Sequence, residues 1–437
     1  MMTARLRPAV SSLALATTLV AFAGCGSDGS PATQPAPSPS AAPSPAPTIA
    51  PSPTPPPMAA GELDPSFGEA GKVRDAITGL DGTVKLLVLS GKRLLVAAVV
   101  DADLVLARFL PDGRLDPTFG DGGRMRPYDG AEPLYHVSRP EPSSDGGLVF
   151  GTNLGTRPAL MRTTGEGMLD PRFGDGGVVV DERQDAPIPV DLIEDARGRL
   201  VTAGGSANTA TVARYLADGT PDTSFGRDGL VQVPPDVAGA RCHLNSVIEQ
   251  PDGHLVAGGT CFSFPPSQPL LVRLDPDGAG EPERLLPRET LPGINGVNEI
   301  AALDDGRFFL SMFDQPAIAS FTPDGVGRED FGTHGLSPYL PGAKLTPLTL
   351  DAAERPVAAG YFIADPFNVY LQLAVGRFTS GGLPDASFGN DGLVVTPFEA
   401  WSSAADVVVQ DDGKIVVAAV VGREAVLLRY SGGSTLR

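Results

Sequence analysis

Short apolar runs alternate with turn-forming residues over most of the sequence. Near the C-terminus, residues 407–409, 414–419 and 425–430 are rich in Val, Ile, Ala and Leu, and Asp412-Gly413 precedes the second run. Glycine adopts positive φ at little cost, so Asp-Gly pairs between such runs indicate tight turns. Together with the run at 392–395, these segments predict four short strands in one unit of the chain.

The same unit recurs along the chain. LDxxFG or a near equivalent stands at 63–68, 115–120, 169–174, 221–226 and 384–389; a weaker copy ends at Phe331-Gly332, and a seventh has lost its Phe-Gly around 281–284. The repeat is about 53 residues long, which is the length of a four-stranded propeller blade. The sequence therefore predicts an all-β fold, a seven-bladed β-propeller of four-stranded repeats. We expect the first motif to close the last blade, so that no sheet edge stays unpaired.

A basic residue marks another fixed place in the unit. This place is held by Arg108, Arg162, Arg214, Arg273, Arg377 and Arg429, and by Ser320 in one unit. Residues that every blade carries are more plausibly scaffold than site. We expect the guanidinium groups to donate charge-assisted hydrogen bonds to the Asp of a nearby LDxxFG motif or to backbone carbonyls. Each Phe of the motif is expected to pack in the core between blades.

The LDxxFGxxG motif, DGKIVVAA at 412–419 and VLLRY at 426–430 resemble the delta-60 repeat, a propeller-forming repeat common in secreted and lipid-anchored bacterial proteins. The resemblance covers residues 63–437. It implies a propeller, and it implies no general catalytic or ligand-binding residue. Double glycines at 204–205 and 258–259 resemble those of kelch repeats, but the Tyr and Trp expected after them are absent, so we reject that family.

The N-terminal segment is typical of an export signal. Arg5 and Arg7 precede an apolar run at 9–23, which is too short to span a hydrocarbon core of about 30 Å. Small residues before Cys25 resemble the bacterial lipobox, which implies a signal peptide at 1–24 and acylation of Cys25. A simple secretory signal with an incidental cysteine is the alternative. Because Gly26 rather than Asp follows Cys25, lipoprotein sorting rules imply the outer membrane, with the protein facing the periplasm or the cell surface.

A low-complexity segment follows the signal. Residues 31–58 consist almost entirely of Pro, Ala, Ser and Thr and carry no charge. Such a composition cannot form a core and favours extended polyproline II. We therefore assign residues 25–60 to a disordered Pro-rich tether and residues 61–437 to the propeller.

Charge limits the classes of partner. The chain has 33 basic and 52 acidic side chains, a formal net charge of −19. A surface of that sign repels nucleic acid and anionic lipid heads. We expect no nucleic-acid partner, a monomeric propeller, contact with the membrane through the lipid alone, and a protein partner in the envelope or outside the cell.

Two cysteines lie within the propeller. Cys242 and Cys261 flank the turn at 250–253 symmetrically, so they are predicted to oppose each other on a hairpin and to form a disulfide in an oxidising compartment. Two buried thiols are the alternative. We predict no cofactor and no metal site. A Ca²⁺ site is the weaker alternative at 275–278 or 121–123, since neither has the twelve-residue loop ending in Glu.

Insertions in two units provide candidate binding loops. The fourth unit carries Phe262 and Phe264, and the sixth carries Tyr361, Phe362 and Phe367, at a place where other units have short connections. Aromatic loop tips favour recognition. The alternative is that these side chains pack onto their own blades.

No catalytic constellation assembles from the sequence. The four histidines are scattered over three units rather than gathered in one, and neither a GxSxG nor an HExxH motif occurs. We therefore expect a non-enzymatic envelope lipoprotein whose propeller is a binding scaffold. The alternative is a hydrolase or lyase that acts on an envelope polymer or glycan through the channel. A carbohydrate-binding module is a third possibility, which the single tryptophan disfavours.

Overall fold

The computed structural model describes residues 58–143, 146–235, 239–262, 267–285, 295–312, 317–365 and 368–433. The chain divides into two units, Met1–Pro55 and Pro56–Arg437, and the described residues all belong to the second. The predicted signal peptide, Cys25 and most of the predicted tether lie outside the described residues, as do Phe264 and Phe367.

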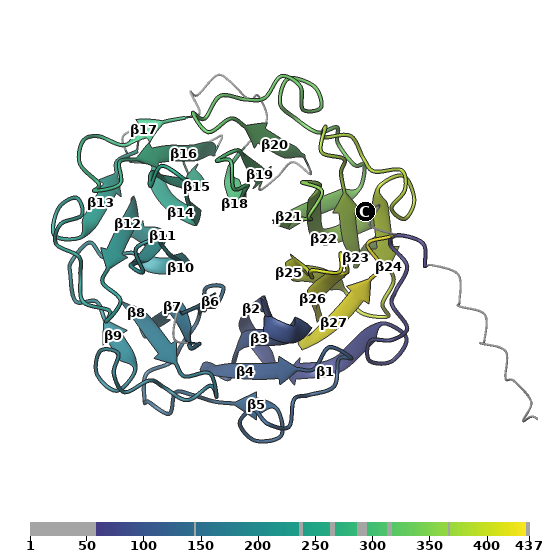
Figure 1. Cartoon of the computed structure of the whole chain (residues 1–437), viewed down its shortest axis with the longest axis horizontal. Coiled ribbons are helices and arrows are strands. Elements are labelled where there is room, and N and C mark those ends of the chain that lie inside the picture. Colours follow the sequence, from purple (N-terminus) through teal and green to yellow (C-terminus); the bar gives the residue numbers. More distant parts are fainter. Residues whose placement is uncertain are drawn as a thin grey trace, which may run out of the picture. The chain divides into compact units, whose positions relative to one another are not determined.

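The second unit is a seven-bladed β-propeller (Figure 1), which confirms the predicted fold class. The strands of each blade run in sequence order from the channel outward, except in blade 7. Blade 1 contains β2 (Leu80–Leu89), β3 (Arg93–Val100), β4 (Asp103–Phe109) and β5 (Arg124–Met125); blade 2 contains β6 (Glu141–Pro142), β7 (Leu148–Leu154), β8 (Arg157–Thr163) and β9 (Val178–Val180); blade 3 contains β10 (Ile188–Glu194), β11 (Leu200–Ser206), β12 (Thr209–Tyr215) and β13 (Leu230–Val233).

The remaining blades repeat this order. Blade 4 contains β14 (Arg241–Glu249), β15 (Leu255–Phe262), β16 (Gln268–Leu274) and β17 (Glu283–Arg284); blade 5 contains β18 (Val297–Ala302), β19 (Phe308–Met312) and β20 (Ile318–Phe321); blade 6 contains β21 (Ala343–Leu350), β22 (Pro356–Asp365), β23 (Asn368–Arg377) and β24 (Leu393–Thr396); blade 7 contains β25 (Ser402–Val409), β26 (Ile415–Val421), β27 (Glu424–Tyr430) and β1 (Lys72–Thr78). A 3-10 turn, η1 (Ser90–Lys92), is the single helical element of the described residues, so none of them forms a helix that could cross a membrane.

Blade 5 departs from the predicted four strands. Its outer position is marked only by a bridge between Ala319 and Leu336. Ser337 donates its backbone N–H to the Ile318 carbonyl at 2.9 Å, but the N–H of Ile318 bonds the Ser337 hydroxyl at 2.8 Å instead of the Ser337 carbonyl. The fourth strand of this blade is therefore reduced to a single bridge.

The ring closes by strand exchange between the two ends of the described chain. The outer strand of blade 7 is β1, which pairs antiparallel with β27 and aligns Lys72 with Leu428. Arg429 also donates its backbone N–H to the Gly71 carbonyl at 3.0 Å. The expectation that the first motif completes the last blade is confirmed.

The meander gives the propeller two chemically different faces. We call the face with the strand 1–2 turns and the LDxxFG turns the turn face, and the face with the strand 2–3 hairpins and the links between blades the hairpin face. The two kinds of turn on the turn face contact each other, because Lys414 of a strand 1–2 turn pairs with Asp64 of a motif at 2.9 Å. Lys92 and Asp412 join the strand 1–2 turns of blades 1 and 7 at 2.8 Å.

A buried arginine latch joins each of several blades to the next. The Nε atoms of Arg108, Arg214, Arg377 and Arg429 donate to the motif carboxylates of Asp116, Asp222, Asp385 and Asp64 at 2.7 to 2.8 Å. The Nη1 atoms donate to carbonyls of the following blade, those of Gly165, Pro276, Gly432 and Pro111. The same guanidinium groups lie over the rings of Phe119, Phe225, Phe388 and Phe67, 4.3 to 4.7 Å from the centroids. These contacts confirm the scaffold role predicted for the repeated Arg, Asp and Phe.

Two blades use different partners at this place. In blade 4, where the motif has lost its Phe-Gly, Arg273 donates instead to the side chains of Gln250 at 2.8 Å and Asp252 at 2.6 Å. In blade 5, Ser320 replaces the arginine and accepts a hydrogen bond from Arg328 at 3.3 Å. The latch is therefore retained where the motif is retained.

The hydrophobic core lies between neighbouring blades. The motif phenylalanines are buried, namely Phe67, Phe119, Phe173, Phe225, Phe331 and Phe388. Each cluster draws side chains from two sheets, as in the group that joins Val96 and Leu94 of blade 1 to Val416 and Leu427 of blade 7. Burial of these faces is the main stabilising contribution, at about 25 cal/mol per Å² of apolar surface.

Replacement of Arg377 by Ala tests the latch. Loss of this guanidinium leaves Asp385 and the Gly432 carbonyl without their main donor, so we expect the free energy of unfolding to fall by about 3–5 kcal/mol. Urea-induced unfolding measures the change. Ser320→Ala in blade 5 is the matched control and is expected to cost less than about 1 kcal/mol. Equal losses in both variants would contradict the assignment.

Candidate functional site: the hairpin face and the channel

The exposed aromatic side chains of the described residues gather on the hairpin face. Tyr135, Phe262, Tyr339 and Trp401 are 62, 46, 54 and 45 % exposed. Their positions are fixed by hydrogen bonds among the links and hairpins, such as that from Gly422 N to the Trp401 carbonyl at 3.2 Å. The large apolar side chains exposed in the turns of the opposite face are not aromatic: Met168, Leu216, Val326 and Leu383.

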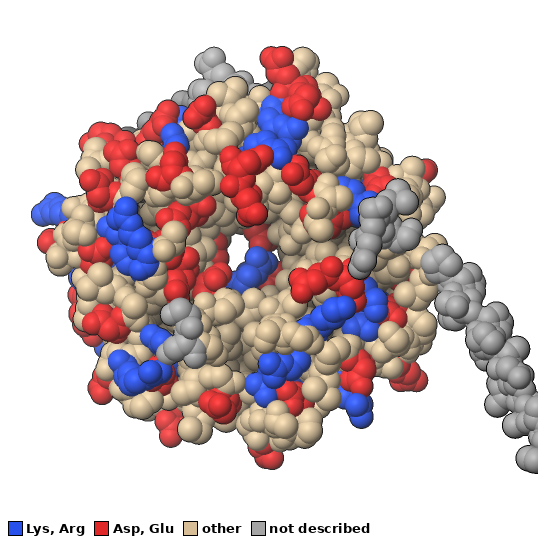
Figure 2. All heavy atoms as spheres, in the orientation of Figure 1, with Lys and Arg blue, Asp and Glu red and all other residues tan. Residues whose placement is uncertain are grey.

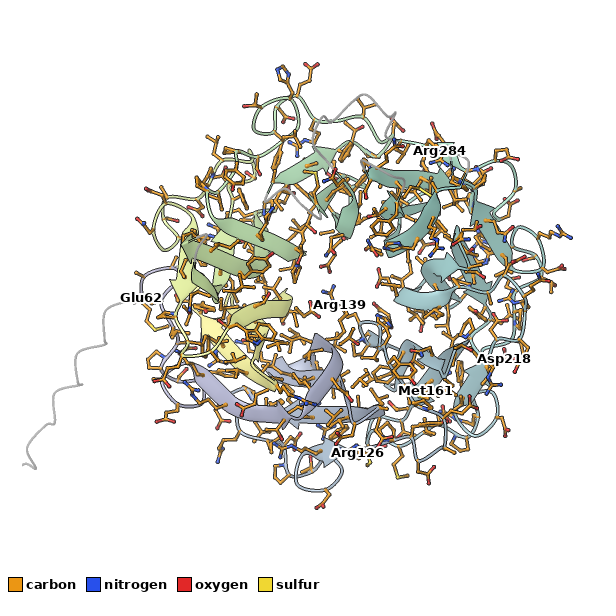
Figure 3. The ribbon with its side chains drawn as sticks, turned by 180° about the vertical axis from the view of Figure 1, so that it is seen from behind. Glu62, Arg126, Arg139, Met161, Asp218 and Arg284 are labelled. Atoms are coloured by element: carbon orange, nitrogen blue, oxygen red, sulfur yellow. A yellow bond between two sulfur atoms is a disulfide. The ribbon has the colours of Figure 1, made fainter. Side chains whose placement is uncertain are left out.

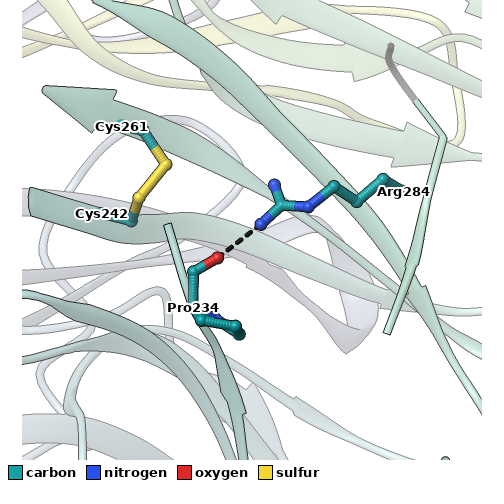
Figure 4. Close-up of a disulfide and its surroundings, with 4 residues drawn as sticks. All are labelled: Pro234, Cys242, Cys261 and Arg284. Atoms are coloured by element: carbon teal, nitrogen blue, oxygen red, sulfur yellow. Dashed lines mark hydrogen bonds between the residues drawn. A yellow bond between two sulfur atoms is a disulfide. The ribbon is translucent and has the colours of Figure 1, made fainter. Parts of the chain in front are cut away.

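One part of this face is braced by a disulfide (Figure 4). Cys242 of β14 is directly opposite Cys261 of β15, and their Sγ atoms are bonded at 1.96 Å. The next residues along, His243 and Phe262, stack with ring centroids 5.1 Å apart. Burial lowers the pKa of His243, so the ring is neutral at physiological pH. Phe262 is therefore an aromatic residue presented on a rigid support.

The corresponding region of blade 6 differs from the predicted loop. Tyr361 and Phe362 lie within β22, which continues to Asp365, because the apolar run 361–363 pairs with the start of β23. Phe362 is partly buried against the core cluster that contains Leu340. For Phe362 the structure favours packing, the alternative considered above, over presentation at a loop tip, and Tyr361 is half-buried in the same strand.

The inner strands place polar residues around the channel. β10, β14, β18 and β25 each contain a register shift, and the residue that follows it is Asp191, Ser246, Glu299 and Asp406, respectively. Each of these side chains accepts a backbone N–H from the next blade, those of Val247, Ile300, Leu348 and Leu86, at 2.8 to 3.2 Å. The oxygen atoms of these four side chains therefore link the innermost strands of neighbouring blades.

Arg139 crosses the channel. Its side chain points into the central opening of the ring (Figure 3), and Figure 2 shows acidic and basic side chains around that opening. Nη2 lies 2.8 Å from Glu299 of blade 5 and 2.5 Å from Asp406 of blade 7. Burial alone would lower the pKa of Arg139, but Asp406 and Glu299 hold it well above its ordinary value. The residue comes from the link before β6, so this contact joins blades 2, 5 and 7.

The carboxyl group of Glu141, on the innermost strand of blade 2, has less nearby positive charge than those of Glu299 and Asp406. Burial and the nearby charges of Asp191 and Glu194 raise the pKa of Glu141 to about 8, although Arg139 acts in the opposite direction. Burial and the charge of Lys85 lower the pKa of His136 to about 4. At neutral pH the channel therefore holds a protonated carboxyl and a neutral imidazole beside a fixed ion-pair network.

This arrangement limits the chemistry of the channel. Asp191, Glu299 and Asp406 all accept backbone hydrogen bonds. Glu299 and Asp406 are also ion-paired with Arg139. Within the described ranges no group of three or more His, Cys, Asp or Glu side chains is placed to hold a metal ion. Asp277, in one of the turns considered for Ca²⁺, caps its own turn through the N–H of Ala279 at 3.0 Å.

Sequence reasoning missed the aromatic links and the channel arginine. Tyr135, Tyr339, Trp401 and Arg139 lie in the links between blades, and no repeated motif marks them. The sequence did contain one indication, because the equivalent positions of the other units hold different residues.

Substitution of Glu141 by Gln tests its environment. A carboxyl whose pKa is about 8 in the folded chain and 4.5 in the unfolded chain favours folding less as pH rises through that interval. The Gln variant lacks this loss, so at pH 9 we expect it to be more stable than the parent by roughly 1–3 kcal/mol, and at pH 4.5 about equal. Thermal unfolding across this range measures the difference. The exposed residue Glu399 provides the control variant, Glu399→Gln; a pH-independent difference for Glu141→Gln would refute the assignment.

Comparison with known proteins agrees with the fold. Residues 93–119, 198–225 and 250–282 match the family model described as "Domain of unknown function (DUF5122) beta-propeller". No curated protein matches the sequence. A solved streptogramin B lyase is similar with a TM-score of 0.51 at 13 % identity, over 82 % of this chain and 97 % of that chain. Virginiamycin B lyase from Staphylococcus aureus is similar with a TM-score of 0.51 at 12 % identity, over 82 % and 98 % of the two chains. These likenesses show the fold alone, and the family match supports a β-propeller repeat family.

Proposed function

We propose that the chain is a lipid-anchored envelope protein whose hairpin face binds a protein partner. The observation that carries this proposal is the placement of Tyr135, Phe262, Tyr339 and Trp401 on one face. Aromatic side chains are enriched in protein–protein interfaces, where they supply large contact area for little loss of conformational entropy. The strongly acidic chain argues against nucleic acid as the partner.

The described chain begins on the opposite face. The Ala60 carbonyl accepts the N–H of Gly389, which belongs to a motif turn, at 3.0 Å, and Gly61 donates to the Ser431 carbonyl at 2.8 Å. The segment that leads back to Cys25 therefore joins the propeller at its turn face. An anchor attached there leaves the hairpin face free to bind.

The proposed anchor depends on the N-terminal sequence. The basic start, the apolar run at 9–23 and the small residues before Cys25 support acylation of that thiol, and Gly26 supports sorting to the outer membrane. The Pro-rich segment that follows would extend by about 3.1 Å per residue as polyproline II. In this proposal the propeller faces the periplasm or the cell surface at the end of that tether.

A Cys25→Ser variant tests the anchor. Without the thiol no thioether-linked lipid can form, so we expect the protein to move from the membrane fraction to the soluble envelope fraction and to lose incorporated radiolabelled palmitate. Fractionation and labelling of cells that express each form measure both effects. Cys242→Ser with Cys261→Ser is the control, since it removes the other two cysteines while leaving Cys25 in place. Unchanged membrane association of the Cys25 variant would exclude a lipobox.

Site-specific photocrosslinking tests the binding face. A photoreactive phenylalanine analogue at Tyr339 or Trp401 is expected to form an adduct with the same protein in intact cells, and the yield should fall when Cys25→Ser mislocalises the chain. The same analogue at Leu216 or Val326, on the turn face, is the matched control. Adducts of equal yield from both faces, or from neither, would contradict binding through the hairpin face.

The alternative of a hydrolase or lyase is supported by a different observation. Arg139, Glu299 and Asp406 converge on the channel axis, with a protonated Glu141 nearby. A carboxyl with a raised pKa is a suitable general acid. Turnover of isolated envelope polymers by the parent protein and its loss in the Glu141→Gln variant would favour this alternative over a binding role.

A further inference from the structure

A cavity opens on the outer rim at the seam where the ring closes. It has a volume of about 570 Å³ and lies between the end of β1 and the outer part of blade 1. Ile77 and Thr78 line it from β1, and Val100, Val105 and Met125 line it from blade 1. Figure 1 shows β1 beside β4 and β5 at this seam. The volume is within the range of small-molecule sites, roughly 300–1,000 Å³.

Two arginines give this cavity a polar edge. Arg124 and Arg126 line it, with Asp121 beside them. Nη2 of Arg124 reaches across the seam to the Ala76 carbonyl at 3.3 Å. Arg126, labelled on the rim in Figure 3, pairs with Asp103 at 2.9 Å, but both side chains are exposed, so this pair contributes little and can be exchanged.

The same seam gathers further positive charge. Lys72 and Arg74 lie on β1 and project over one ring, that of Phe398, with centroid distances of 4.9 and 5.8 Å. Burial and the neighbouring charge of Arg74 lower the pKa of Lys72. Neither cation has a carboxylate within ion-pair distance in the described part of the chain. A region with uncompensated cations is unusual on a protein with a net charge of −19.

A cavity beside the outer strand of blade 2 provides an internal comparison for these two positions. Its volume is about 600 Å³; Val178, Val179 and Val180 line it, together with Asp175 and the blade 3 turn that contains Asp218. The registers of the outer strands place Val178 where blade 1 has Arg124, and Val179 where blade 1 has Met125. At these outer-strand positions blade 2 has only valines, whereas blade 1 places the guanidinium groups of Arg124 and Arg126 at its cavity.

We propose that the seam cavity binds an amphiphilic anion, an aliphatic chain with one carboxylate or phosphate head. The chain lies against Ile77, Val100, Val105 and Met125, and the head accepts hydrogen bonds from Arg124 and Arg126. Guanidinium groups suit this task because their paired N–H donors match the oxygens of a carboxylate or phosphate. The site is separate from the hairpin face and does not depend on the proposed function.

Calorimetric titration of the whole chain tests the site with defined probes. Dodecanoate and dodecyl phosphate, kept below their critical micelle concentrations, are expected to bind one site per chain. Acetate and inorganic phosphate, which supply the head without the chain, and dodecyltrimethylammonium, which reverses the charge of the head, are expected to bind at least about tenfold more weakly. Equal binding of the cationic amphiphile, or of the short anions, would overturn the proposal, as would no binding of either long-chain anion.

The comparison between blades supplies the variants. Arg124→Val with Arg126→Val copies the blade 2 cavity, so the fold should tolerate it, and dodecanoate affinity is expected to fall at least about tenfold. Val178→Arg with Val180→Arg, combined with Asp218→Ala to remove the acidic side chain of that cavity, places the same two arginines in blade 2 and is expected to add a second site. Unchanged affinity in the first variant overturns the proposal. If the first variant unfolds, the second decides: a stoichiometry that stays at one overturns the proposal, and a stoichiometry of two supports it.

Discussion

The structure depends on the contact that each latch arginine makes with two blades at once. A blade alone would leave both faces of its sheet exposed to water, so it is stable only between neighbours. The guanidinium group binds a carboxylate in its own blade and a carbonyl in the next, and it covers a phenylalanine ring that belongs to the core. The same chemistry closes the ring, because Arg429 near one end of the chain binds Asp64 near the other.

The latch also explains how an acidic protein tolerates buried aspartates. Burial alone would raise the pKa of Asp64, but hydrogen bonds from Ser66 and Lys414 and the charge of Arg429 lower it well below its ordinary value. The carboxylate is thus ionised in the interior and fully bonded. The channel uses a related arrangement, in which Arg139 neutralises Glu299 and Asp406 while the next blade's amides satisfy their remaining oxygens.

The repeat explains how much of the structure could be predicted. Residues that recur in register, such as Phe388 and Arg377, could be assigned to the scaffold, because a residue repeated in most blades is expected to make the same structural contact in each of them. Blade 5 departed from prediction at Ser337, whose hydroxyl accepts the hydrogen bond that its carbonyl would accept in a regular ladder. Arg139 and Trp401 occur once, in links whose path the sequence pattern does not specify. Their positions follow from tertiary packing, and this is why the candidate sites were less predictable than the fold.

Ring closure by β1 has a consequence for biosynthesis. Among the described strands of the ring, β1 is synthesised before all others and its pairing partner β27 after all others, so the sheet of blade 7 cannot be completed until the strands of every other blade have been made. Until then β1 has an unpaired edge, and so does whichever blade has most recently formed. A polypeptide truncated by a premature stop codon before residue 424 would keep both edges permanently, which makes it prone to aggregation and a substrate for quality-control proteases.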